Sequence, residues 1–197
     1  MSKTLILASK SASRRAMLDA AGVAYESIPA DIDERAVEAG LAGASPAEVA
    51  DALAVAKAAA VAGMHPQALV IGSDSLVICA GRRFDKPRSR EEAAAHLRFF
   101  SGKVMELHSA AALVQDDGCL WSDASLARLN VRALSDKFIE YYLTLEWPAI
   151  AHTVGAFRIE GPGVQLFERI EGDQFTVLGM PLLPLLGALR EEGVLLA

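Results

Sequence analysis

A serine-rich turn near the start of the chain carries the first residues that could do chemistry. Its candidate anion ligands are Ser9, Ser11, Arg14 and Arg15. Serine hydroxyls and turn amides can hold phosphate oxygens, and a guanidinium pairs with phosphate through two parallel hydrogen bonds. The alternative is a helix cap followed by two solvated arginines. The turn lacks the glycines of a Walker A loop or a dinucleotide-binding fingerprint.

Carboxylates provide a second group of candidates. Asp74 follows an apolar run, so we expect it at the end of a buried strand, where α/β proteins place ligands. Asp31, Asp33 and Glu34 form an acidic loop. Converging carboxylates can hold a hard cation such as Mg²⁺, which usually bridges to substrate phosphates. The alternatives are an Asx turn at Asp74 and a solvated acidic loop.

Two lysines, Lys57 and Lys86, complete the candidates. Lys57 is the only charged residue between Asp51 and His65, in an alanine-rich segment that predicts a helix. Lys86 precedes a proline in a predicted loop. For each of them the alternative is a solvated lysine that keeps the protein soluble.

Histidines and cysteines argue against several other chemistries. The four histidines lack tight metal-ligand spacing, so we do not expect a zinc site. Cys79 and Cys119 are too few for a disulfide framework, and we expect both to be core residues in a reducing compartment. A serine hydrolase with a G-x-S-x-G elbow is not expected, since the chain has no such motif.

Composition and charge narrow the class of protein. The chain has 197 residues, of which 52% are hydrophobic and 22% charged, so it can bury a substantial globular core. The net charge of −6 argues against nucleic acid as a partner, although local cations can still bind a small phosphate-bearing molecule. No apolar run reaches the ~18 residues of a membrane span. The first apolar stretch is too short for a signal peptide, so we expect a cytoplasmic protein without a membrane partner.

Hydrophobic and capping patterns predict the elements that must position these residues. Capping serines at 45, 89 and 135 predict helices to about residues 63, 100 and 145. Further helices are expected before Gly22 and over 182–192. Predicted strands cover 4–8, 25–29, 69–71, the hairpin 103–114 and 119–131, 156–160 and 164–170, with 75–79 as a second strand or a continuation. A hairpin beside strand–helix units predicts an α/β fold with a mixed sheet, in one domain or two tightly coupled lobes.

In their order and separation, these fragments resemble the Maf family of nucleoside triphosphate pyrophosphatases over nearly the whole chain. The matching fragments are Leu7-Ala8-Ser9-x-Ser11 with Arg14-Arg15, Asp33-Glu34, Leu53-Ala54-x-x-Lys57-Ala58, Ile71-Gly72-Ser73-Asp74, Lys86-Pro87, Leu97 with Ser101-Gly102, Gly155-Ala156-Phe157 with Glu160-Gly161, and Gly179-Met180-Pro181. The resemblance implies one domain over 1–197, with an elongated mixed sheet, flanking helices and two lobes around a deep cleft.

The resemblance also implies an activity. Members of that family cleave a nucleoside triphosphate between the α and β phosphorus atoms and need a divalent metal, so we expect Mg or Mn as cofactor. By residue match, Asp74 and Glu34 are implied as catalytic residues and metal ligands, with Lys57 and Lys86 facing phosphate. The serine-rich turn matches the family's anion-binding turn. Whether Asp74 is a general base or a metal ligand stays open.

Two departures from the family pattern concern the anion geometry and the substrate. Ser13 occupies the position of the first arginine of the usual pair, so Arg14 aligns with the second and Arg15 is one position further on. Glu160 stands where many members have glutamine, which resembles the branch acting on 7-methylguanosine triphosphate. A carboxylate there favours a cationic or donor-rich base edge, but the preferred base is left open.

Three functions remain possible for a chain with these residues and this resemblance. The first is hydrolysis of ordinary or modified nucleoside triphosphates to clean the nucleotide pool. The second is a non-catalytic nucleotide-binding regulator of septum formation or cell division. A phosphomonoesterase that releases orthophosphate is the third. Because family members are often dimers, we expect a homodimer.

Overall fold

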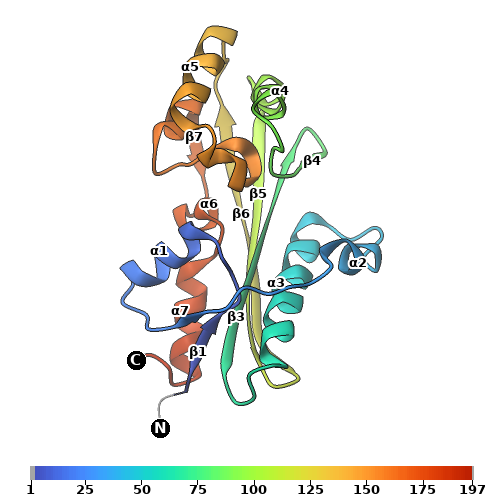
Figure 1. The fold of residues 1–197 in the computed structure, drawn as a ribbon, viewed down its shortest axis with the longest axis vertical. Helices are drawn as coiled ribbons and strands as arrows, with labels where there is room; N and C mark the ends of the chain where they lie inside the picture. The colour runs from blue at the N-terminus through green and yellow to red at the C-terminus, as the bar shows by residue number, and fades with distance from the viewer. Residues whose placement is uncertain (1–2, 197) are drawn as a thin grey trace. The chain divides into compact units, whose positions relative to one another are not determined.

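The computed structural model describes residues 3–196. Across that range the chain forms a mixed seven-stranded sheet in the order β2-β1-β3-β5-β6-β7, with β4 also paired to β3. The pairs β1–β2 and β1–β3 are parallel, whereas β3–β4 and β6–β7 are antiparallel. The predicted α/β class with a mixed sheet and flanking helices is confirmed (Figure 1).

The elements have the following bounds. The strands are β1 (Leu5–Leu7), β2 (Glu26–Ser27), β3 (Leu69–Cys79), β4 (Arg82–Phe84), β5 (Val104–Gln115), β6 (Gly118–Val131) and β7 (Phe167–Glu171). The α-helices are α1 (Ala12–Ala20), α2 (Glu34–Ala39), α3 (Pro46–Ala62), α4 (Arg90–Phe100), α5 (Asp136–Glu146), α6 (Gln174–Leu178) and α7 (Leu182–Glu191). Short 3-10 helices are η1 (Ala149–His152), η2 (Val154–Ala156) and η3 (Pro162–Leu166).

The chain divides into two compact units. The described residues of the first unit are 3–75, 109–125 and 174–196, and the second unit comprises 76–108 and 126–173. Strands β3, β5 and β6 contribute residues to both units. The predicted single domain over 1–197 and the cleft between two lobes stay predictions.

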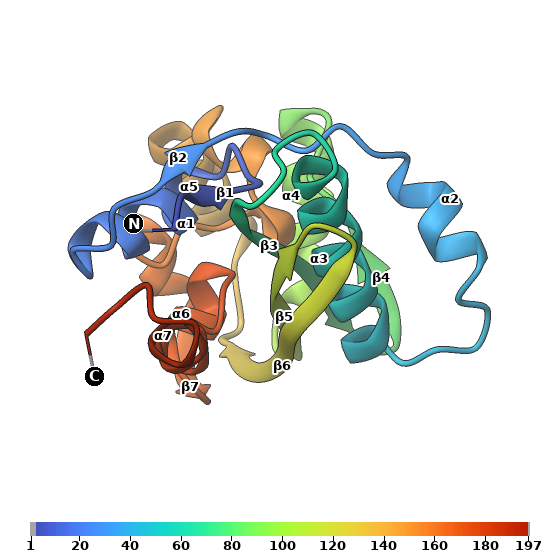
Figure 2. The same cartoon turned by 90° about the horizontal axis from the view of Figure 1, so that it is seen from below.

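In the first unit, helices cover both faces of the strands. Odd-numbered residues of β1 and β3, such as Leu7 and Ile71, pack in a core with α1 and α7. Even-numbered residues, such as Ile6 and Val70, pack in a second core with α3. Figure 2 shows α3 on one side of β3, with α1 and α7 on the other. This two-residue alternation is what a strand buried on both faces requires.

In the second unit, α4 and α5 lie side by side and are tied together by ion pairs. Arg90 of α4 pairs with Glu140 of α5 at 2.9 Å, and Arg98 pairs with Asp136 at 2.7 Å. Phe84 of β4 packs against the aromatic face of α4, with ring centroids 4.7–5.1 Å apart. The residues between α5 and β7 form turns and 3-10 helices rather than regular strands.

Capping signals located the helices well, and strand ends were less predictable. Ser45, Ser89 and Ser135 each cap the helix predicted to follow them. The predicted strand at 156–160 is wrong, because Gly155 and Ala156 have φ of 80° and 55°, which turn the chain. The predicted strand at 164–170 begins only at 167, after η3.

The sequence pattern predicts Asp74 at the end of a strand, and this prediction is wrong. Asp74 lies in the middle of β3, which continues through the small residues 72–75 to Cys79. The alternative of a continued strand over 75–79 is therefore correct. In the part of the chain described by the structure, no helix is both long and apolar enough to cross a membrane.

Candidate active site

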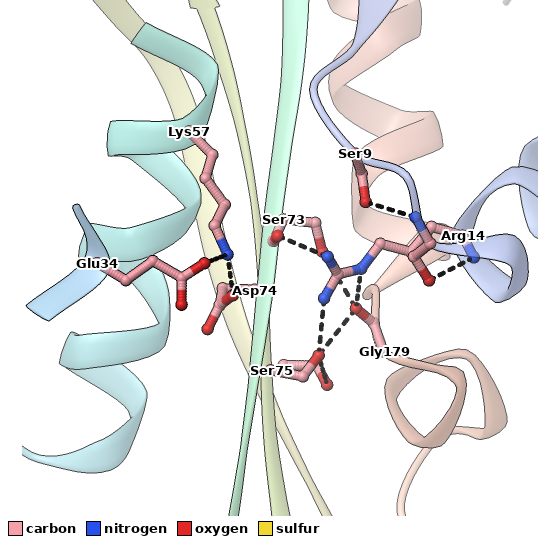
Figure 3. Close-up of polar contacts among 10 residues, drawn as sticks. Ser9, Arg14, Glu34, Lys57, Ser73, Asp74, Ser75 and Gly179 are labelled. Atoms are coloured by element: carbon pink, nitrogen blue, oxygen red, sulfur yellow. Dashed lines mark hydrogen bonds and ion pairs between the residues drawn. The ribbon is translucent and has the colours of Figure 1, made fainter. Parts of the chain in front are cut away.

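Three residues predicted from the sequence meet beside β3 in the first unit. The ammonium of Lys57, on α3, donates a hydrogen bond to the Asp74 carboxylate and forms an ion pair with Glu34 Oε1 at 2.7 Å (Figure 3). The side chains of Lys57 and Asp74 are only 14% and 12% exposed, whereas Glu34 is 47% exposed. Two carboxylates therefore converge on one cation, and one side of the cluster is open to solvent.

A glycine sets the distance between the helix and the strand that carry this cluster. Gly72 lies two residues before Asp74 and thus on the same face of β3. A Cβ at Gly72 would lie 1.9 Å from the carbonyl oxygen of Ala54 and 2.8 Å from the amide nitrogen of Ala58. The backbones of β3 and α3 are therefore close enough for Lys57 to reach Asp74. Sequence reasoning gave Gly72 no role, although a glycine inside a strand is a sign of close backbone approach.

The acidic loop is the start of a helix. Asp33 is the N-cap of α2, and its Oδ1 accepts a hydrogen bond from the amide of Ala36 at 3.1 Å. Glu34 is the first residue of that helix, and Asp31 is exposed. The Asp33 carboxylate therefore caps α2, and a part for it in binding a cation stays a prediction.

Glu34 and Asp74 remain as possible metal ligands. Among residues 3–196, no three His, Cys, Asp or Glu side chains gather as a preformed metal site. Mg²⁺ in phosphate-binding sites is commonly held by one or two carboxylates, with water and substrate phosphates as its other ligands. Both carboxylates already approach one positive charge, the Lys57 ammonium, so this donor set fits a hard divalent cation.

The serine-rich turn caps α1. Ser11 is the N-cap, and its hydroxyl accepts a hydrogen bond from the amide of Arg14 at 3.5 Å. Ser9 is buried, and its hydroxyl accepts a hydrogen bond from the amide of Ser11 at 3.2 Å. The turn therefore has the helix-cap structure that the sequence offered as an alternative. Its role in anion binding stays a prediction.

The two arginines of this turn have different environments. Arg15 is exposed. Arg14 is partly buried, and its guanidinium donates hydrogen bonds to acceptors on β3 and on the turn between α6 and α7. Burial lowers the pKa of Arg14, while the charges of Asp74 and Glu34 act in the opposite direction. Only Arg15 matches the alternative of a solvated arginine.

Lys86 and Glu160 belong to the second unit. Lys86 is exposed in the segment between β4 and α4, and Glu160 is exposed in a turn before η3. Their predicted approach to Asp74 stays a prediction. The two cysteines also differ, because Cys79 is buried as expected and Cys119 is exposed, contrary to the expectation of a core residue.

The turn that carries Glu160 is held by a partly buried ion pair that sequence reasoning missed. Arg158 donates from Nε to Glu146 Oε2 at 2.7 Å and from Nη2 to Glu146 Oε1 at 3.0 Å. The Glu146 side chain is only 2% exposed, and its hydrogen bonds raise the pKa of Arg158. The hydroxyl of Tyr142 donates to the carbonyl of Ala156 at 3.2 Å, and burial raises the pKa of Tyr142. These contacts attach Ala156 and Arg158, which shortly precede Glu160, to α5.

The chain is similar to a known protein family and to several named bacterial proteins. A family model described as "Maf-like protein" matches residues 4–192. A protein of Rhizobium meliloti (strain 1021) named "7-methyl-GTP pyrophosphatase" is 52% identical over 197 residues, covering 99% of each chain. A protein of Brucella suis biovar 1 (strain 1330) with the same name is 47% identical over 98% of each chain. A "Nucleoside triphosphate pyrophosphatase" of Rhodopseudomonas palustris (strain HaA2) is 46% identical, covering 97% of this chain and 95% of that one.

Proposed function

The chain belongs to the Maf-like protein family, and from this premise we propose that it hydrolyses nucleoside triphosphates to a monophosphate and pyrophosphate. The family predicted from the sequence fragments is thereby confirmed. The observation that carries the proposal is the cluster of Asp74, Glu34 and Lys57 beside β3. This cluster offers both acidic and basic groups at one place, which a simple nucleotide binder does not need.

The charge of the substrate explains why such a cluster is required. A nucleoside triphosphate carries about four negative charges near neutral pH, so an anionic nucleophile is repelled unless cations neutralise the phosphates. Lys57 supplies one cation, and its hydrogen bond to Asp74 fixes the orientation of that carboxylate. In this proposal Asp74 orients the attacking water or accepts its proton, which requires the carboxylate form.

Glu34 and Asp74 are the residues that would hold a divalent cation, Mg²⁺ or Mn²⁺. When bound, such a cation neutralises phosphate charge and makes a coordinated water more acidic. The exposure of Glu34 leaves room on one side of the cluster for ligands from solvent or substrate. Lys86 and the serine-rich turn with Arg15 complete the proposed set of phosphate contacts.

A substitution of Asp74 by asparagine tests the proposal directly. Asp74→Asn keeps the size of the side chain and removes its negative charge and proton-accepting ability. We expect the variant to fold, as measured by circular dichroism and thermal unfolding, and to lose most pyrophosphate release in the presence of Mg²⁺. EDTA should abolish the wild-type activity. Near-normal turnover by a folded Asp74→Asn variant refutes the assignment.

The product distinguishes the proposed enzyme from its alternatives. Release of pyrophosphate together with monophosphate supports the proposal. Release of orthophosphate alone would instead indicate a phosphomonoesterase. Nucleotide binding without any turnover would favour the non-catalytic regulator. The proposed physiological setting is the cytoplasmic nucleotide pool, and the proposed homodimer is checked by light scattering.

Glu160 is the proposed contact to the base of the substrate. Relatives at 52% and 47% identity are named for 7-methyl-GTP, whereas the relative at 46% carries the general name. A carboxylate pairs well with the donor-rich edge of a cationic purine such as 7-methylguanine. We expect Glu160→Gln to change the order of preference across 7-methylguanosine, 5-methyluridine and inosine triphosphates. An equal loss with all three substrates contradicts a role in base selection.

A further inference from the structure

We infer that Arg14 is a positioning residue, which binds both chain neighbours of Asp74 and does not bind the substrate phosphates. The inference rests on the proposed function, because it takes Asp74 as the catalytic carboxylate. It replaces the phosphate contact that the sequence pattern assigns to Arg14.

The guanidinium of Arg14 contacts both neighbours of Asp74. Nη1 donates to the backbone carbonyl of Ser73 at 2.7 Å, and Nη2 donates to the hydroxyl of Ser75 at 3.1 Å. Figure 3 shows Arg14 on one side of β3, with Lys57 and Glu34 on the other. Because side chains alternate along a strand, Arg14 holds β3 from the face opposite to the Asp74 carboxylate.

A carbonyl at the end of α6 completes the attachment. The carbonyl oxygen of Gly179 accepts hydrogen bonds from Arg14 Nε at 2.9 Å, from Ser73 Oγ at 3.1 Å and from Ser75 Oγ at 3.0 Å. Gly179 has a φ of 102°, a backbone conformation that side-chain-bearing residues rarely adopt. The turn at Gly179 therefore presents its carbonyl to β3 and α1 together.

The network extends to a second strand, β5. Ser75 Oγ lies 3.0 Å from Ser109 Oγ on β5, and Ser109 donates to the carbonyl of Thr176 at 2.8 Å. Ser73 and Ser109 have no exposed surface. Ser109 uses its one hydroxyl proton on Thr176, so the one proton of Ser75 serves either Ser109 Oγ or the carbonyl of Gly179. Buried hydrogen bonds of this kind fix the position of the segments they join. The segment that they fix here is the part of β3 that carries Asp74.

This use of the guanidinium competes with phosphate binding. All three guanidinium nitrogens of Arg14 donate to protein acceptors. Nη1 and Nη2 donate to β3, and Nε donates to the carbonyl of Gly179. Turning the side chain toward a substrate would leave the carbonyl of Ser73 without this donor, and an unpaired buried acceptor is unfavourable. Arg15, which is exposed, is the arginine of this turn that is free to face an anion.

Replacement of Arg14 by lysine separates positioning from binding, because lysine keeps the charge and loses the planar fork. We expect Arg14→Lys to lower kcat about tenfold or more with KM changed by less than about twofold. Arg15→Lys is the contrasting variant, in which KM should rise more than kcat falls. A rise in KM for Arg14→Lys with kcat retained overturns the inference.

Ser75→Ala tests the same network without changing any charge. We expect it to lower kcat and leave KM unchanged, and its combination with Arg14→Lys to cost less than the product of the two single effects. Independent, multiplicative effects overturn the inference. The same double-mutant cycle measured on the free energy of unfolding tests the network without activity. If the wild type releases no pyrophosphate, the proposed function fails, and uncoupled unfolding energies separately refute the network.

Discussion

Replacement of Gly72 by alanine should disturb both the stability and the activity of this protein. The added Cβ would lie 1.9 Å from the carbonyl oxygen of Ala54, 2.8 Å from the amide nitrogen of Ala58 and 2.9 Å from its Cβ. Ordinary contacts begin near 3.4 Å, so α3 and β3 must separate by about 1.5 Å. Two of the three blocking atoms belong to the helix backbone, so a change of side-chain rotamer cannot relieve the clash.

The size of the effect follows from this geometry. Overpacking in a protein core lowers the free energy of unfolding by roughly 1–3 kcal/mol. Because the clash is with backbone, we expect Gly72→Ala to lose about 3 kcal/mol. For a chain of this size, that loss lowers the melting temperature by roughly 6–12 °C. Lys57 lies on α3 between the two alanines that must retreat, so its contact with Asp74 is weakened as well. Pyrophosphate release should fall in the folded variant.

Thermal unfolding and initial rates of pyrophosphate release, measured on the same preparation, test both effects. Gly187→Ala is the matched control, because Gly187 lies inside α7 and a Cβ there meets no atom within 4 Å. Alanine in a helix interior should stabilise the protein by about 0.5–1 kcal/mol, the opposite sign to Gly72→Ala. If Gly72→Ala unfolds at the wild-type temperature and keeps wild-type activity, the proposed close packing of α3 on β3 is refuted.

Two further variants test the second unit. Arg158→Leu leaves the Glu146 carboxylate buried without its partner, so we expect a loss of roughly 3 kcal/mol in urea unfolding; a loss below about 1 kcal/mol contradicts this. Hydrogen bonds from Arg88 lower the pKa of Glu92 from 4.5 to about 2. The stabilisation from Glu92 is therefore present above pH 4.5 and lost as the pH falls toward 2, and Glu92→Gln should remove that part of the acid dependence of stability. Identical pH profiles for the variant and the wild type would contradict the prediction.

Local signals in the sequence predicted the helices because their physical cause is local. Each capping serine accepts a hydrogen bond from an amide three residues ahead, as in Ser45 with Glu48 and Ser135 with Phe138. Such contacts depend on neighbouring residues alone. The hairpin between β5 and β6 has the same origin, since Asp116 takes a φ of 52° at the turn.

The site was predictable only in part, because its contacts join distant segments. The acidic and basic candidates Glu34, Lys57 and Asp74 could be recognised by type and by family resemblance. Their convergence on one ammonium depends on the packing of α3 on β3, which the sequence does not display. The partners of Arg14 are even harder to predict from the sequence, since its contact with Gly179 spans 165 positions. Glu146 gave no signal, because a buried carboxylate is recognised only when its partner Arg158 is known.

The four residues from Gly72 to Ser75 show how one strand serves two environments. Gly72 and Asp74 face α3, where close approach and a negative charge are needed. Ser73 and Ser75 face Arg14 and the carbonyl of Gly179, where small hydrogen-bond donors are needed. A shift of β3 by one residue would place the Asp74 carboxylate against that carbonyl oxygen and a serine against the backbone of α3. Charge and backbone contact therefore fix the register of β3, although the apolar pattern is interrupted at these positions.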